Sequence, residues 1–516
     1  MQTQLIAAFI CAALAGCAVA QTTGPQRTGP SSSASPYVTA TAPGWNVTSI
    51  ITVGTPNGVA QKNADNGYAM VGTPDGLGAY DNGDNTFTVL MNHELRANSG
   101  IARAHGSVGA FVSEWVISKT DFRVISGADL TRRLANGDSQ HLVSTGAGTW
   151  APANTVAGAN NAFGRLCSAD LPAVSAFYNA ATGLGTQSRI FMNGEEQGTE
   201  GRAYGFVATG AAKGNTCELP ELGKFSWENS VANPFSGDRT VVIGLDDASP
   251  GQVYVYSGMK TRTGNDVQRA GLDNGTLRGI KVDAANAQGG ADANREVGQI
   301  NGSFTTEAID TAQSGALQQA ESVAQKVTEF ARPEDGHWAD ARTFYFVTTG
   351  ATVSGVVNPS RLYRLRFAGG AGGAVDYEKG TVSMVLQADS LTGADGAVAR
   401  NFDNIVVADN GEILIQEDPG DSAYIAKTWL FNPVTGTATQ IMESDRSRFL
   451  PGAAAFLTQN EESSGVIEVT RVLGRNDGLR YFLGSMQAHY AIAGELAHGG
   501  QLYVMAAPEP SRAAVR

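Results

Sequence analysis

Short segments rich in β-branched and aromatic residues recur along most of this 516-residue chain, and Gly, Asn, Asp or Pro bounds each of them. Clear examples are "RAYGFVATG", "GQVYVYSG", "TFYFVTTG", "SRLYRLRF", "GEILIQED", "KTWLFNP" and "GQLYVMA". Val, Ile, Tyr and Phe favour strands, whereas the bounding residues favour tight turns. The pattern therefore predicts an all-β fold built from hairpins and meanders.

The strand–turn unit recurs without a fixed sequence period. An irregular β-propeller explains such a pattern, because each blade can carry its own insertions. A β-sandwich is the alternative, although a sandwich is normally shorter. Propellers of this length form one unit, so we predict a single domain over residues 41–508, followed by a tail at 509–516.

The N-terminal residues are predicted to lie outside this domain. "MQTQLIAAFICAALAGCAVAQ" has an apolar stretch followed by small residues, which indicates a signal peptide over residues 1–20 and a secreted or periplasmic protein. "LAGC" is also a possible lipoprotein site with Cys17 as the modified residue. Residues 21–40 are rich in Ser, Thr, Pro and Gly, and they predict a flexible tether. No later run is apolar over the ~18 residues of a membrane span.

Two segments indicate helices within the β pattern. "SGALQQAESVAQKVTEFA" carries apolar residues at helical spacing, which predicts a helical insertion over about 314–331 that Pro333 ends. "FGRLCSADLPAVSAFYNAA" predicts a second, shorter helix. Both segments lead into polar clusters, where a propeller would place its site loops.

Charge and cysteine content limit the possible partners. The net charge of −13 argues against nucleic acid and anionic membranes, and it suits a soluble protein that binds cations. Cys167 and Cys217 are the cysteines that follow the signal peptide. They either form a disulfide, or Cys167 is a metal ligand or a free buried thiol.

Several predicted strands end in carboxylates. "NHEL" follows a strand pattern, "RIFMNGEEQG" and "GEILIQEDPG" end in acidic pairs, and "FARPEDGHW" places acids after the predicted helix. Solvated turns are the alternative explanation. Because propeller blades converge on one axis, we expect these side chains to meet and to bind calcium, which prefers oxygen ligands. The candidate residues are Asn92, Glu94, Glu195, Glu196, Glu334 and Asp418.

Arg332 lies two residues before Glu334 in the same segment. A guanidinium group matches phosphate oxygens with two parallel hydrogen bonds, and metal ions together with an arginine are typical of phosphoryl transfer. The alternative is a surface ion pair between Arg332 and Glu334, which would contribute only about 0–1 kcal/mol.

The order of four motifs resembles the PhoX-type alkaline phosphatases. The motifs are "MNHEL", "MNGEEQ", "ARPEDG" and "FDNIVVADNGEILIQED", and the resemblance covers about residues 50–465. "GLDDASPGQVYVYSGMK" and "NEESSGVIEV" are similar to segments of a PhoX-like branch of secreted proteins.

The resemblance implies a propeller of about six blades that hydrolyses phosphomonoesters with bound calcium and ferric iron. It implies that Asn92 and Glu94 contact substrate or metal, that Arg332 holds the phosphate, and that Cys167 binds iron. Glu195 or Glu196, Glu334 and Asp418 would bind metal. The expected partners are small phosphate esters, and we expect a monomer. The alternatives are a calcium-stabilised propeller that only binds or scaffolds at the cell surface, and another propeller hydrolase such as a lactonase or phytase-like enzyme.

Overall fold

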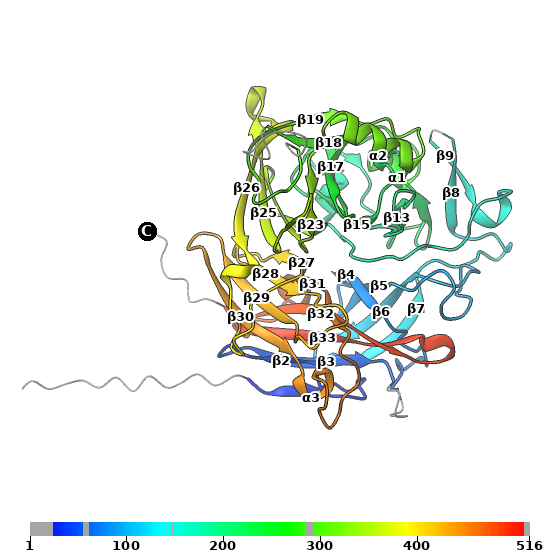
Figure 1. The fold of residues 1–516 in the computed structure, drawn as a ribbon. Coiled ribbons are helices and arrows are strands. Elements are labelled where there is room, and N and C mark those ends of the chain that lie inside the picture. The colour runs from blue at the N-terminus through cyan, green and yellow to red at the C-terminus, as the bar shows by residue number, and fades with distance from the viewer. Residues whose placement is uncertain (1–23, 55–60, 147, 284–293, 510–516) are drawn as a thin grey trace, which may run out of the picture.

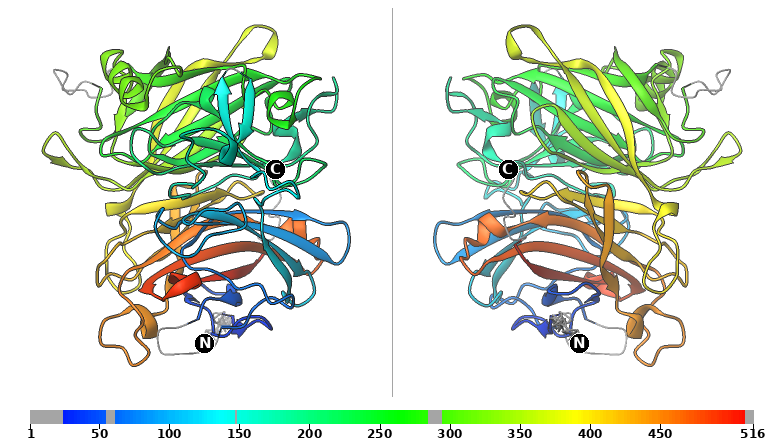
Figure 2. Two further views of the ribbon diagram at one scale, coloured as in Figure 1. Left: turned by 90° about the vertical axis from the view of Figure 1, so that its right-hand side faces the viewer. Right: turned by 90° about the vertical axis from the view of Figure 1, so that its left-hand side faces the viewer.

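The computed structural model of the chain describes residues 24–54, 61–146, 148–283 and 294–509. Within these ranges strands predominate, and they form six blades around a central axis (Figures 1 and 2). The prediction of an all-β propeller is therefore confirmed. The predicted signal peptide lies outside the described residues, as does the predicted tail after Glu509.

Blades 1 to 3 begin in the first half of the chain. Blade 1 contains β4 (Pro74–Asp81), β5 (Thr86–His93), β6 (Phe111–Ser118) and β7 (Val124–Asp129). Blade 2 contains β12 (Ile190–Gly194), β13 (Ala203–Val207), β14 (Thr216–Glu218), β8 (His141–Gly146) and β9 (Thr149–Pro152). Blade 3 contains β15 (Trp227–Ala232), β16 (Arg239–Asp246), β17 (Gly251–Met259), β18 (Thr276–Val282) and the short β20 (Glu329–Phe330).

Blades 4 to 6 follow in the same order. Blade 4 contains β21 (Pro333–Trp338), β22 (Thr343–Thr348), β25 (Arg361–Gly369) and β26 (Val375–Gln387), and β19 (Asn301–Ala308) joins it to blade 3. Blade 5 contains β27 (Phe402–Val407), β28 (Ile413–Glu417), β29 (Lys427–Asn432) and β30 (Thr437–Ser444). Blade 6 contains β31 (Glu461–Glu468), β32 (Leu479–Ala491) and β33 (His498–Pro508).

The first strand of each blade lies nearest the axis, and these inner strands contact one another around the ring. Blade 2 is the exception, because the short segment 166–170 lies closer to the axis than β12 does. Leu166 bridges Glu195 and Asp170 bridges Met192, both in antiparallel orientation. Segment 166–170 is therefore the inner edge of blade 2, although it is too irregular to count as a strand.

The prediction of a flexible tether over residues 21–40 is wrong for its described part. β1 (Gln26–Thr28) pairs with β3 (Asn46–Thr52), which itself pairs with β33 in blade 6. β2 (Val38–Ala40) pairs with β30 in blade 5. Backbone pairing and the complete burial of Tyr37 order this Ser- and Pro-rich segment despite its composition. The N-terminal strands (blue) therefore lie beside the C-terminal strands (red) in Figure 1 and close the ring.

The helical predictions need correction at their ends. α2 covers only Gly315–Ala324, because Lys326 adopts a left-handed backbone conformation and β20 then pairs with β17. Pro333 does not end the helix and instead begins β21. In the second segment, pairing with β12 leaves only a 3-10 turn, Val174–Ala176.

Among the described residues, the remaining α-helices and the two separate two-stranded hairpins are short. They are α1 (Asp266–Arg269), α3 (Arg446–Phe449), α4 (Thr470–Leu473), and the hairpins β10–β11 (Tyr178–Asn179, Leu184–Gly185) and β23–β24 (Thr352–Val353, Val356–Val357). Among the described residues, no helix combines the length and the apolar character that a membrane span requires. Apolar clusters between the sheets hold the blades in place, such as the one that joins Tyr345 of blade 4 to Trp429 of blade 5.

Candidate metal centre

One backbone arrangement recurs in all six blades at the same end of the axis. A residue on the inner edge pairs with a residue on the second strand of its blade, and the next residue on each of the two segments carries a polar side chain or a thiol. The pairs are Pro74–His93, Leu166–Glu195, Trp227–Asp246, Pro333–Thr348, Phe402–Glu417 and Glu461–Ala488. In blades 1, 3, 4 and 5 a bulge directly follows this pair. Bulges beside a site redirect side chains, which here places them toward the axis.

The six residues that follow the pair on the inner edge form what we call the axial ring. They are Asp75, Cys167, Glu228, Glu334, Asp403 and Glu462. The six residues that follow the pair on the second strand form the outer tier. They are Glu94, Glu196, Asp247, Thr349, Asp418 and His489. Of the residues that the sequence analysis selected, Glu94, Cys167, Glu196 and Glu334 have possible ligand atoms close to one another.

Possible ligand atoms lie close together in three overlapping groups. The groups are Asp75–Glu94–Cys167, Cys167–Glu196–Glu228 and Glu228–Asp247–Glu334, and the ligand atoms of each group lie within 4.8 Å of one another. Cys167 belongs to the first two groups, and Glu228 belongs to the last two. Neighbouring ions could therefore share a ligand. Each group joins adjacent blades, so the fold itself brings the ligands together.

Burial and repulsion between carboxylates raise the pKa values of Asp75, Glu228 and Glu334. For Asp75 the burial of the carboxyl is the largest cause and the charge of Glu94 is the next. The pKa values of Glu228 and Glu334 are also raised, first by burial and then by neighbouring carboxylates. Burial likewise raises the pKa of the Cys167 thiol, with Asp75 as the next cause. A bound cation would reverse these shifts, because it stabilises carboxylates and thiolates in their charged forms.

The donor chemistry of the site fits metal ions. Asp75 Oδ1 and Glu228 Oε1 are buried and have no hydrogen-bond partner among the described residues. Buried carboxylate oxygens without partners are costly unless a cation satisfies them. Many carboxylate oxygens suit calcium, whereas one thiolate among them suits a transition metal such as iron.

Amide side chains position the ligands on the blade 1 side. Asn92 Nδ2 donates a 2.7 Å hydrogen bond to the Cys167 carbonyl oxygen. Gln487 Nε2 donates to Asp75 Oδ2 at 2.7 Å, to Glu94 Oε2 at 2.6 Å and to Glu462 Oε1 at 3.2 Å. Asn92 therefore contacts the backbone of a candidate ligand, while its Oδ1 atom is buried without a described partner.

Glu195 and Glu196 have different environments, although the sequence predicted either as a ligand. Glu195 Oε1 accepts hydrogen bonds from Arg202 Nη2 at 2.7 Å and from the Gly164 backbone N at 2.8 Å. It is bound within blade 2 and belongs to none of the three groups. Glu196 lies in the outer tier and belongs to the second group.

Two arginines lie beside the carboxylates. Arg332 makes a two-pronged contact with Asp247, at 2.8 Å from Nε and 2.6 Å from Nη2, and its Nη2 lies 3.2 Å from Glu334 Oε1. Arg165, which the sequence analysis missed, contacts Glu94 and lies 2.8 Å from Glu196 Oε2. Each arginine side chain is 37% exposed. Both therefore have a surface that faces solvent.

The backbone of Arg332 adopts a left-handed conformation with φ 63°. Thr73 and Asn401, which lie two residues before the axial-ring residues of blades 1 and 5, do the same with φ 45° and 50°. Such conformations cost about 1–3 kcal/mol for residues with a side chain, and they cluster at functional sites. The tight turn into the inner strand is therefore part of the site.

Asp418, Cys167 and Cys217 are the remaining residues that the sequence analysis singled out. Asp418 lies in the outer tier of blade 5, and burial followed by the charge of Glu462 raises its pKa to about 7. His489, which the sequence analysis missed, lies 3.6 Å from Glu462. Cys167 and Cys217 are both buried free thiols, so a disulfide between them is not formed in this structure. Cys217 packs in the apolar cluster that lies between blades 2 and 3.

The sequence analysis missed most of the axial ring. Asp75, Glu228 and Asp403 are single acids within strand patterns, where no acidic pair marks them. The sequence did contain one signal for these residues. The number of residues that separates Asp75 from Glu94 equals the number that separates Glu228 from Asp247. Asp247 and Glu462 belong to acidic turns that the strand-end pattern did not select.

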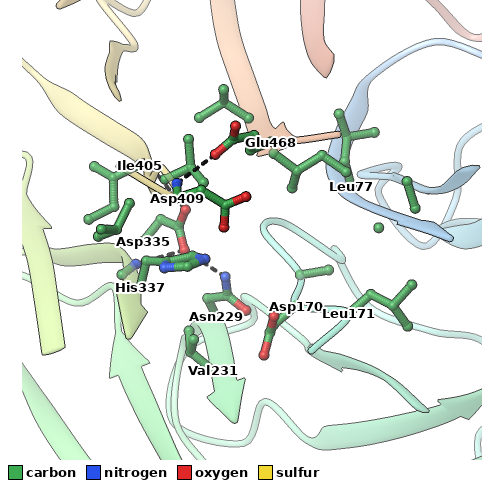
Figure 3. A pocket seen from close by; sticks show the side chains of 18 of the residues that line it. Leu77, Asp170, Leu171, Asn229, Val231, Asp335, His337, Ile405, Asp409 and Glu468 are labelled. Carbon is green, nitrogen blue, oxygen red and sulfur yellow. Dashed lines mark hydrogen bonds between the residues drawn. The ribbon is translucent and has the colours of Figure 1, made fainter. Parts of the chain in front are cut away.

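A polar cavity of about 230 Å³ lies further along the axis, beyond the axial ring (Figure 3). The inner edges of all six blades line it, and none of the axial-ring residues does. Asp335 accepts hydrogen bonds there from Asn229 Nδ2 at 2.6 Å and from the Ile405 backbone N at 3.0 Å. Asp170 faces the same space and accepts from the Ala232 backbone N at 2.8 Å.

Comparison with known proteins supports this description of the fold. A family model described as alkaline phosphatase PhoX matches residues 27–448. No curated protein sequence matches the chain. Among solved structures, Pseudomonas fluorescens PhoX in complex with vanadate, a transition-state analogue, aligns with a TM-score of 0.54 at 14% identity. That alignment covers 94% of this chain and 97% of the other.

A second solved structure is less similar. The periplasmic gluconolactonase PpgL of Pseudomonas aeruginosa aligns with a TM-score of 0.33 at 11% identity, over 84% of this chain and 89% of the other. This level of similarity carries no conclusion about activity.

Proposed function

This chain belongs to the PhoX family of alkaline phosphatases, which are phosphoric monoester hydrolases, and on that premise we propose that its axial ring and outer tier bind calcium and ferric iron for the hydrolysis of small phosphomonoesters. Family membership favours this function over the scaffold and over other propeller hydrolases. The proposed metal residues are Glu94, Cys167, Glu196, Glu334 and Asp418 from the sequence analysis, together with Asp75, Glu228 and Asp247.

The observation that carries the proposal is the chain of three overlapping ligand groups, with Cys167 shared by two of them. Bound metal ions would act as Lewis acids that neutralise charge on phosphoryl oxygens and lower the pKa of water. The protein's own contribution is to hold the carboxylates and the thiolate in place from adjacent blades.

We propose that Arg332 binds the phosphate group of the substrate. Its guanidinium group is fixed on one side by Asp247 and Glu334, and its other side is exposed. The two carboxylates hold the guanidinium group in one orientation. Its exposed N–H groups can therefore bind two phosphoryl oxygens without a large loss of side-chain entropy. Asn92 acts as a positioning residue, because it binds the backbone of Cys167.

Metal content and turnover should be measured on the same preparation. We expect purified protein to contain calcium and iron, to hydrolyse p-nitrophenyl phosphate, and to lose activity to a chelator in a way that added metal reverses. Glu334→Gln should lower both metal content and activity. A protein that contains no metal, or that keeps full turnover after its metals are removed, would contradict the proposal.

We also propose that the protein is exported, on the basis of its N-terminal sequence. Cleavage after residue 20 would leave Gln21 as the first residue, whereas lipidation would leave a modified Cys17. Mass spectrometry of the protein recovered from the native host distinguishes these two forms. An unprocessed N-terminus on the recovered protein would contradict export.

A further inference from the structure

Arg165 and Arg332 occupy corresponding positions in different blades. Arg165 lies two residues before Cys167, and Arg332 lies two residues before Glu334. Cys167 and Glu334 hold the same place in the axial ring, because each follows the residue that pairs with the second strand. Blade 3 lies between the blades that carry the two arginines.

Their contacts also correspond. Arg165 binds Glu94 and Glu196 of the outer tier, and Arg332 binds Asp247 of the outer tier and Glu334 of the axial ring. Both are 37% exposed, whereas the side chains of their acidic partners are between 4% and 13% exposed. Each arginine therefore lies over the carboxylates with part of its guanidinium group open to solvent.

The two arginines lie at the two ends of one continuous cluster of carboxylates. Arg165 lies 2.8 Å from Glu196, whose ligand atom lies within 4.8 Å of one of Glu228. Glu228 in turn belongs to the group of Asp247 and Glu334, the two acids that Arg332 contacts. An anion placed above Glu196 and the carboxylates of blade 3 would have a guanidinium group on each side.

We propose that Arg165 is a second phosphate-binding residue, which acts with Arg332 to select phosphomonoesters that carry two negative charges. This inference rests on the proposed function. A doubly charged phosphoryl group has three terminal oxygens and can accept hydrogen bonds from two guanidinium groups at once. A phosphodiester has one charge and two such oxygens, so a second guanidinium group increases its binding affinity less.

A purely structural role for Arg165 is the competing explanation. In that case Arg165 would only neutralise Glu94 and Glu196, and its loss would release metal. If it binds phosphate, its loss would instead weaken phosphate binding at unchanged metal content. The two roles are therefore separable by measuring both quantities on one variant.

The test compares Arg165→Gln, Arg165→Lys and Arg332→Gln with the wild-type protein. Arg269→Gln is the matched control, since Arg269 is 36% exposed and pairs with the buried Asp266 in α1, outside the site. We would measure metal content, the binding of inorganic phosphate by calorimetry, and KM and kcat for p-nitrophenyl phosphate and bis(p-nitrophenyl) phosphate.

For Arg165→Gln we expect phosphate affinity to fall about 10- to 100-fold, as for the loss of a charge-assisted hydrogen bond. KM for the monoester should rise by a similar factor, and KM for the diester should change less than about threefold. Arg165→Lys should recover part of the lost phosphate affinity, because lysine restores the positive charge but not the paired N–H donors of the guanidinium group. The control should behave as the wild type.

Unchanged phosphate affinity and KM in Arg165→Gln would overturn the proposal, and so would an equal loss for monoester and diester. A loss of metal in this variant would also overturn it, in favour of the structural role. If the wild-type protein hydrolyses no phosphate ester, the proposed function fails, while calorimetry with inorganic phosphate still decides whether Arg165 binds the anion.

Discussion

Glu195 and Glu196 are adjacent in the chain, but their carboxylates serve different purposes. Glu195 is held by Arg202 within blade 2, and Glu196 lies among the possible ligands around Cys167. We predict that Glu196→Gln lowers metal affinity at least about tenfold, together with turnover, because a neutral amide oxygen binds these cations more weakly than a charged carboxylate. Glu195→Gln should keep its metal content. Elemental analysis after dialysis against a weak chelator measures both.

The Glu195 variant also acts as a stability control, because it leaves Arg202 with a neutral partner in a mostly buried position. It should therefore unfold at a lower temperature than the wild type, without a change in metal stoichiometry. Equal metal loss in both variants would contradict the distinction between the two neighbours.

Asp170 is a residue whose charge should affect stability rather than catalysis. Burial at the axial cavity raises its pKa to about 7, against a small lowering by the Ala232 backbone hydrogen bond. Because the pKa in the folded state lies above that in the unfolded state, its contribution to stability is complete below pH about 4 and is lost as the pH rises through 7.

We therefore predict that Asp170→Asn becomes more stable relative to the wild type as the pH rises from 5 to 8. The difference should approach about 2–4 kcal/mol, since each pKa unit corresponds to about 1.4 kcal/mol. The amide oxygen can still accept from the Ala232 N–H. Urea unfolding at several pH values tests this, and a constant difference between the two proteins would disprove it.

At the scale of single elements, the N-terminal strands have an unexpected role. β1 and β3 extend blade 6 and β2 extends blade 5, so the first described strands complete the last two blades of the chain. Tyr37, next to β2, is fully buried, and its backbone N donates to Gln501 Oε1 at 2.7 Å. Its ring packs edge-on against Phe449, 5.6 Å away.

We predict that Tyr37→Ala lowers the free energy of unfolding by about 3–5 kcal/mol, as for other large buried aromatic residues. Phe235→Ala is the control, because Phe235 is 53% exposed and its loss should change stability by less than about 0.5 kcal/mol. Chemical denaturation of both variants is the measurement. A Tyr37→Ala protein as stable as the control would mean that this segment is a tether after all.

The strands could be predicted because their pattern is local. "TFYFVTTG" and "GEILIQED" each contain one complete strand, β22 and β28, since alternation and bounding turns lie within a few residues. β2 and segment 166–170 could not be predicted in this way. Both are short, and their partners β30 and β12 lie elsewhere in the sequence.

The same reason explains which site residues were found. Glu94, Glu196, Glu334 and Asp418 stand beside other polar residues at strand ends, so their positions are visible locally. The axial ring depends instead on which residue pairs with which across a blade, and that register is a property of the whole sheet. Arg165 was missed because its segment resembles a helix in sequence.

At the scale of the whole molecule, the axis concentrates negative charge. The axial ring and the outer tier together contain carboxylates from every blade. Among the described residues, the cations that contact them include Arg165, Arg332 and, when it is protonated, His489. The chain as a whole carries a net charge of −13. Like charges at such short range oppose the close approach of the inner strands unless cations compensate them.

We therefore predict that metal removal destabilises the propeller, and increasingly so at higher pH. Without cations, the raised pKa values of Glu228, Glu334 and Asp403 mean that the folded state keeps protons that the unfolded state loses. The stability of the chelated protein should therefore fall as the pH rises through these values. Cations that bind only the folded state oppose this loss, by about 2.7 kcal/mol for one site at a hundredfold excess over its Kd. Thermal unfolding with and without chelator at pH 5 and pH 8 should show a larger difference in Tm at pH 8, and an equal or smaller difference there would show that the axial charges do not limit the stability of the fold.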